Sequence, residues 1–150
     1  MLTNPVFGPD FVDKAGSGDL FEITESKLAL SRSTNPQVKD FAGAMIAAHT
    51  KSTAALQKAV DESGETVDLP TALPDDLQTK VAALTLIAAG SAFDKAYVAD
   101  QIAAHQDALG ALQNYARRGD TPALKTFAAA AAPVVADHLT RANTLQASLK

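Results

Sequence analysis

The side chains best suited to chemistry in this sequence are its histidines and a few glutamates, because its 150 residues include three histidines and no cysteine. Each histidine lies in a stretch where apolar residues recur every three or four positions, a spacing that puts side chains on one face of a helix. His49, His105 and His138 fall in the middle of these apolar faces, and Glu22 has the same place in an earlier stretch. The pattern predicts four inward-facing polar residues, each on its own helix.

These four residues are expected to meet at one level of a helical bundle. A helix rises about 1.5 Å per residue, so they stand at heights of roughly 15 to 21 Å when successive helices run antiparallel. Burying such groups in an apolar core is costly unless a partner satisfies them. Neutral imidazoles and a carboxylate are good ligands for Zn, Fe, Mn or Cu. The sequence therefore predicts that one transition-metal ion, from among these four metals, is bound by Glu22, His49, His105 and His138.

Other polar or polarizable residues flank the predicted ligands. Glu25 lies one turn beyond the predicted glutamate ligand and is a candidate additional ligand. Gln101 and Met45 each lie one turn before a histidine, where an amide could hydrogen-bond a ligand and a thioether could bind copper. Asp94 and Tyr97 also face inward, but Asp94 is roughly 16 Å from the third-helix histidine along the axis. We expect these last two residues to be structural polar groups in the core.

The composition predicts an all-α fold. About a fifth of the residues are alanine, the best helix former, and only 5% are aromatic. Proline and glycine divide the chain into four long helices and a short one. The four long helices are predicted at Pro9–Arg32, Pro36–Ser63, Ser91–Arg118 and Pro122–Leu149, and the short one at Asp75–Ala89.

Short links between the first and second helices, and between the third and fourth, predict an up-down four-helix bundle. It forms one domain over residues 9–150 after an N-terminal extension at 1–8. The short extra helix lies between the second and third long helices of this bundle, either across one end or folded back along it. Pro133 is expected to kink the fourth long helix just before His138.

Several classes of function are not indicated. The formal net charge is −4 and no basic run is longer than Arg117-Arg118, so nucleic acid is not an expected partner. The longest apolar stretch, 127–136, is too short to span a bilayer. Without cysteine there is no disulfide, thiolate zinc site or iron–sulfur cluster. No nucleophile motif or glycine-rich phosphate loop is present, so the sequence names no catalytic residue.

Five segments resemble a known bacterial family. They are Phe11-Val12 followed by Glu22, Lys39–Ala42 followed by His49, Phe93–Val98 followed by His105, Leu124–Ala128, and Pro133 followed by His138-Leu139. Together they are similar to a ferritin-like family of exported proteins known as a domain of unknown function and often labelled outer-membrane proteins. The resemblance implies a four-helix ferritin-like bundle and a periplasmic or otherwise exported location after removal of a signal peptide. It implies no particular activity, and the outer-membrane label does not fit a chain without a membrane-spanning pattern.

The chain also differs from di-iron ferritins, which use Glu-x-x-His pairs, because it contains no Glu-x-x-His. One ion held by three histidines and a glutamate fits better than a ferroxidase centre. The predicted function is metal binding, with a role in metal handling or stress protection. Two alternatives stay open: a metal-free structural or interaction module with a hydrogen-bonded polar layer, and a metal-dependent oxidoreductase with an open coordination position. The sequence identifies no protein partner.

Overall fold

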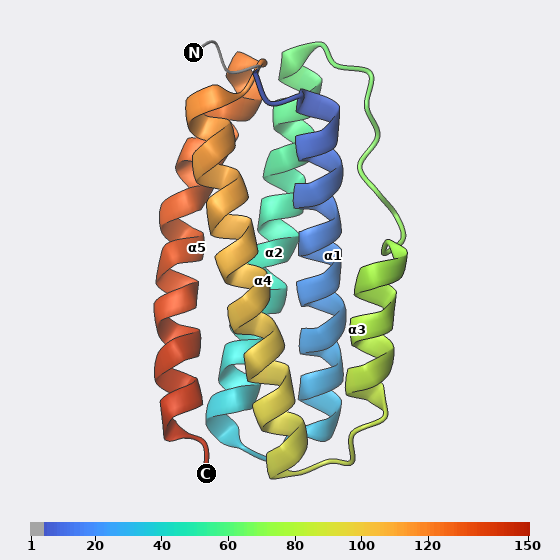
Figure 1. Cartoon of the computed structure of the whole chain (residues 1–150), viewed down its shortest axis with the longest axis vertical. Coiled ribbons are helices and arrows are strands. Elements are labelled where there is room, and N and C mark those ends of the chain that lie inside the picture. Colours follow the sequence, from blue (N-terminus) through green and yellow to red (C-terminus); the bar gives the residue numbers. More distant parts are fainter. Residues whose placement is uncertain (1–4) are drawn as a thin grey trace.

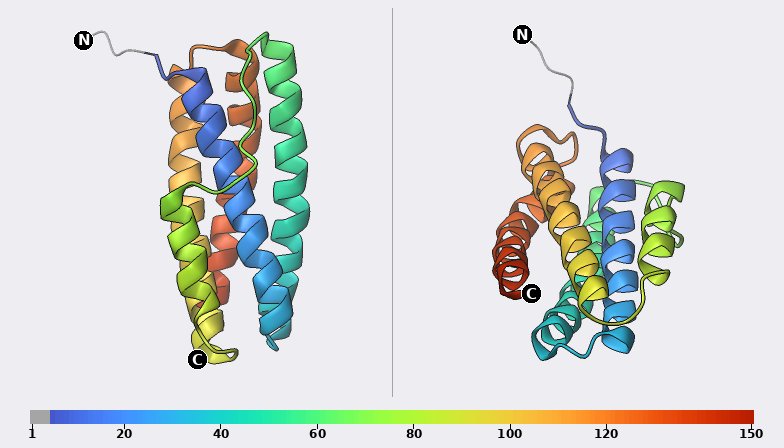
Figure 2. Two further views of the ribbon diagram at one scale, coloured as in Figure 1. Left: turned by 90° about the vertical axis from the view of Figure 1, so that its right-hand side faces the viewer. Right: turned by 60° about the horizontal axis from the view of Figure 1, so that its bottom comes forward.

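The computed structural model describes residues 5–150 and is built from helices (Figure 1). These helices are α1 (Gly8–Arg32), α2 (Pro36–Ser63), α3 (Asp75–Thr85), α4 (Ser91–Arg118) and α5 (Pro122–Ser148). The long helices α1, α2, α4 and α5 lie side by side (Figures 1 and 2). Helix α1 runs antiparallel to α2, and α4 runs antiparallel to α5, but α2 and α4 run in the same direction (Figure 1). The predicted up-down order is wrong for this step, because the segment with α3 returns the chain to the end where α2 begins. The predicted all-α bundle is confirmed, and with the short helix it contains five helices in the described part of the chain.

The helix ends follow local sequence signals. Asn35 caps α2, because its side-chain Oδ1 accepts hydrogen bonds from the backbone N–H groups of Gln37 at 2.9 Å and Val38 at 3.3 Å. Gly64 ends the same helix in the left-handed region, at φ 77°, which glycine adopts without a steric penalty. The predicted bounds hold within one residue for the long helices. The short helix is shorter than predicted, because it ends at Thr85 whereas the predicted end is Ala89.

The predicted N-terminal extension is described only in part, since residues 1–4 lie outside the described range. Val6 forms an isolated parallel bridge with Gly119, in which Val6 N–H donates to the carbonyl of Arg118 at 2.8 Å. The first residues of the described chain are therefore held against the link between α4 and α5. The division into an extension and one domain stays a prediction.

The short helix α3 folds back along the bundle beside α1 and does not lie across its end (Figures 1 and 2). The segment before it packs tightly on α1: a Cβ on Gly16 would lie 2.7 Å from Cδ of Pro70, so only glycine fits there. At the other end, the Arg32 guanidinium donates to the carbonyls of Thr85 at 2.6 Å and Ile87 at 3.0 Å. Contacts before and after α3 thus fix its place on the bundle.

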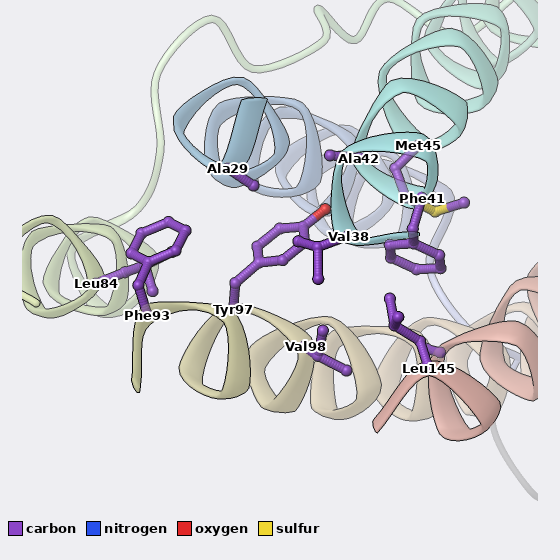
Figure 3. Close-up of a cluster of buried hydrophobic side chains, with 11 residues drawn as sticks. Ala29, Val38, Phe41, Ala42, Met45, Leu84, Phe93, Tyr97, Val98 and Leu145 are labelled. Carbon is purple, nitrogen blue, oxygen red and sulfur yellow. The ribbon is translucent and has the colours of Figure 1, made fainter. Parts of the chain in front are cut away.

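The apolar core is divided into two clusters. The lower cluster, at the end where α1 meets α2, is shown in Figure 3 and contains Ala29, Val38, Phe41, Ala42, Met45, Leu84, Phe93, Tyr97, Val98, Ala142 and Leu145. The upper cluster contains Phe11, Val12, Leu56, Ala59, Val60, Leu112, Tyr115, Leu124, Ala128 and Val135. In each long helix, the polar residue singled out from the sequence falls between the segments that supply these two clusters. A polar layer therefore separates the two halves of the core.

No helix in residues 5–150 is long and apolar enough to cross a membrane. The helix α5 continues through Pro133 as one element. The chain positions its polar layer with four helices that are each long enough to reach both clusters.

Candidate metal centre

Three buried histidines from three helices converge in the polar layer. One ring nitrogen from each of His49, His105 and His138 can be chosen so that all three atoms lie within 4.8 Å of one another. Their ring centroids are 5.7 Å apart for His49 and His105, 6.1 Å for His49 and His138, and 5.8 Å for His105 and His138. A single ion between three nitrogens at such separations could contact all of them. The structure thus brings together the three histidines that the sequence singled out.

His49 is oriented by an aspartate on α1. Its Nδ1 donates a hydrogen bond of 2.8 Å to Oδ1 of Asp19, and Thr53 Oγ1 donates to the other carboxylate oxygen at 3.1 Å. This leaves Nε2 of His49 on the opposite side of the ring, against Oε2 of Glu22. A carboxylate that accepts from one ring nitrogen and leaves the other for a metal is a recurring arrangement around metal-binding histidines.

His105 is oriented in the same sense by its own helix. Its Nδ1 donates to the backbone carbonyl of Gln101 at 2.6 Å and lies 3.3 Å from Oε1 of Glu22. Its Nε2 is buried and has no hydrogen-bond partner. The side-chain amide of Gln101, which the sequence suggested as a hydrogen-bonding group, is itself buried without a partner. The backbone carbonyl of Gln101, and not its side chain, therefore orients His105.

His138 has a different environment from the other two histidines. Its Nδ1 is buried without a hydrogen-bond partner. Burial lowers the pKa of this imidazole to about 4, and the nearby rings of His105 and His49 contribute in the same direction. For His49, burial again favours the neutral ring, but the hydrogen bonds with Asp19 and Glu22 outweigh it and raise the pKa to about 10. The layer thus combines a protonated and a neutral imidazole when no metal is bound.

The predicted glutamate ligand lies beside this triad. Glu22 is 2% exposed and contacts His49 and His105, but it is not among the three residues whose ligand atoms are all mutually close. Glu25 is fully buried one turn away, and both of its carboxylate oxygens lack hydrogen-bond partners. Neither glutamate belongs to the mutually close group, which among the described residues consists of histidines alone.

The remaining predicted residues lie outside the triad. Met45 and Tyr97 pack in the lower cluster, where Tyr97 Oη shares a hydrogen bond of 2.7 Å with Ser26 Oγ. Asp94 is buried near the start of α4. The sequence analysis missed Asp19, whose position three residues before Glu22 on the same helix face was the available signal.

Comparison with known proteins shows what the chain is similar to. None of the curated protein sequences compared with it matches. Two solved structures share its fold: a DUF305 fragment from Deinococcus radiodurans, with a TM-score of 0.79 and 14% identity over 94% of this chain and 95% of that one, and CopM in the Cu(II)-bound form, with a TM-score of 0.76 and 13% identity over 95% of this chain and 97% of that one. The model of the domain of unknown function DUF4142 matches residues 5–145. The chain therefore belongs to the DUF4142 family.

Proposed function

We propose that this protein binds one transition-metal ion through His49, His105 and His138, with Glu22 as a fourth ligand. The observation that carries the proposal is the convergence of three buried imidazoles in which His105 Nε2 and His138 Nδ1 have no hydrogen-bond partner. A buried polar atom without a partner costs free energy that a folded protein normally avoids. A metal ion would satisfy these nitrogens together.

The hydrogen bonds around the triad support this assignment. Asp19 and the Gln101 carbonyl each accept from an Nδ1 atom, so both Nε2 atoms are directed away from these partners. Nε2 of His105 has no partner, and Nε2 of His49 contacts Glu22, the proposed fourth ligand. Such outer contacts fix the tautomer of a ligating histidine and raise its basicity. A metal-free structural layer should hydrogen-bond all its members to one another. Glu22 pairs with His49, but His105 Nε2 and His138 Nδ1 have no partner, and these two nitrogens are evidence against that alternative.

The ligand chemistry also ranks the candidate metals. Imidazole suits Zn, Cu and Fe, and the general affinity order of divalent ions places Cu(II) above Zn(II), Fe(II) and Mn(II). The similarity of fold to CopM, a protein described with bound Cu(II), agrees with copper as the tightest-bound ion. We propose a role in metal handling or stress protection in an exported protein. The ferritin-like and exported character rest on the family resemblance.

Elemental mass spectrometry of the full chain purified without an affinity tag tests the proposal. The chain is stripped with a chelator, reloaded in turn with Cu, Zn, Fe and Mn, and melted with and without chelator. We expect about one equivalent of metal and a melting temperature that chelation lowers, because a ligand of the folded state stabilises it. His105→Ala should lose the metal, whereas Gln106→Ala, an exposed neighbour on α4, should keep it. Failure of all four metals to bind would refute the proposal.

A further inference from the structure

The nitrogen atoms of the histidine layer are closed to solvent, so a metal ion reaches them only when a side chain moves. His49 Nε2, His105 Nε2 and His138 Nδ1 are all buried. On the lower side of the layer, Phe41 and Met45 are buried in the lower cluster, and the Phe41 ring centroid lies 6.4 Å from that of His105. Because protein interiors are close-packed, this side offers no path to the layer.

The upper side of the layer borders a cavity that extends to the protein surface. Its volume is about 920 Å³. Three of the four proposed ligands line it, namely Glu22, His49 and His138. Exposed residues, among them Lys51 and Asp107, line it as well. One continuous space therefore connects the solvent with side chains of the proposed metal centre.

The three histidines differ in how firmly they are held. Nδ1 of His49 is bound to Asp19, and Nδ1 of His105 is bound to the Gln101 carbonyl. Nδ1 of His138 has no such partner. His138 is also the most exposed of the three, at 8% against 6% for His49 and 0% for His105. Since a buried hydrogen bond is costly to break, the His138 ring moves at a lower cost than the other two.

We propose that the metal enters and leaves the layer through this cavity, and that rotation of the His138 ring opens the last step while His49 and His105 stay in place. This inference rests on the proposed metal binding and deepens it, because it assigns the route of the ion and the ligand that moves. A barrier between solvent and site is crossed in both directions. Narrowing the cavity therefore slows loading and release alike, and leaves the equilibrium affinity unchanged.

Stopped-flow mixing of the metal-stripped full chain with Cu(II) tests the route, with quenching of the fluorescence of its two tyrosines as the signal. Transfer of Cu(II) from the loaded chain to excess chelator measures release. Ala131→Phe, which narrows the cavity, should lower both rate constants by the same factor of about ten or more, with Kd unchanged. Ala129→Phe, at an exposed position of α5 that does not line the cavity, should change neither.

Nuclear magnetic resonance relaxation of the metal-stripped chain tests which ligand moves. We expect microsecond-to-millisecond exchange at the ring of His138 and none at the rings of His49 and His105. Exchange of equal size at all three rings, or a His138 ring without exchange, would overturn the assignment of His138 as the moving ligand.

The rate measurements separate the route from the metal site. Metal binding with rate constants that Ala131→Phe leaves at wild-type values would overturn the route alone. A slower association with unchanged release, and thus a weaker Kd, would also overturn it. A wild-type chain that binds no metal would overturn the proposed function and the route together. If Ala131→Phe does not fold, Ala55→Phe on the α2 wall of the cavity decides by the same rate constants, with the exposed Ala54→Phe as its control.

Discussion

Replacing Glu25 by glutamine is expected to stabilise the metal-free protein at neutral pH. The Glu25 side chain is fully buried, and neither carboxylate oxygen has a hydrogen-bond partner. Burial raises the pKa of this carboxyl to about 10; the nearby Asp100 adds to the rise, and Gln101 and Lys80 oppose it. The folded protein therefore keeps a proton on Glu25 at pH 7, whereas the unfolded chain releases it.

The sign and size of the effect follow from this difference in bound protons. Above the unfolded pKa of 4.5, the folded state binds one more proton than the unfolded state, so the free energy of unfolding falls as pH rises. The fall continues until pH approaches the folded pKa of about 10. At 1.36 kcal/mol per pH unit, the loss between pH 4.5 and pH 7 is at most about 3 kcal/mol. Glutamine keeps the shape without the ionisation, so Glu25→Gln removes this loss.

Urea unfolding of the metal-stripped protein at pH 4, 7 and 9 measures the effect. We expect wild type and Glu25→Gln to be similar at pH 4 and to diverge steadily as pH increases, with the variant more stable. Glu62→Gln is the matched control, because the Glu62 side chain is 60% exposed and its replacement should not change the pH dependence. The reasoning is refuted if Glu25→Gln and wild type show the same dependence of unfolding free energy on pH.

Three further changes test other parts of the structure. Asp19→Asn should weaken metal binding by about 10- to 100-fold without unfolding the protein, because it removes the carboxylate that orients His49; competition titration with a metal indicator measures this, and unchanged affinity would contradict it. Gly16→Ala should lower the melting temperature because its Cβ would collide with Pro70, whereas Gly18→Ala, with nothing within 4 Å, should not. Asn35→Ala should cost about 1 kcal/mol in chemical denaturation by removing the cap of α2, and a cost near zero would show that the cap is unimportant.

The helices and the histidine triad could be predicted from the sequence because both depend on local periodicity. Apolar spacing placed each histidine at the centre of its helix face. Each also lies near the middle of its helix, so the three meet at one height although α2 and α4 run in the same direction. The structure agrees, since His49, His105 and His138 separate the two core clusters along their helices. A short link allows the two helices it joins only a few relative placements. The height of a residue in the bundle can therefore be worked out from its position in the sequence.

The features that the sequence could not supply depend on side-chain rotamers and long connections. The direction in which Glu22 extends, and the hydrogen bond from His49 to Asp19, are set by packing across helices. The position of α3 depends on the close contact between Gly16 and Pro70, which are far apart in the chain.

X-ray absorption spectroscopy of the protein loaded with one equivalent of Zn(II) tests the central claim most directly. The account predicts three imidazole nitrogens at about 2.0–2.1 Å, recognised by the outer-shell scattering of the histidine rings. Loss of one ring from this pattern in His138→Ala would assign the ligand. A coordination shell without imidazole scattering, or one unchanged by that substitution, would contradict a metal centre built on the three histidines.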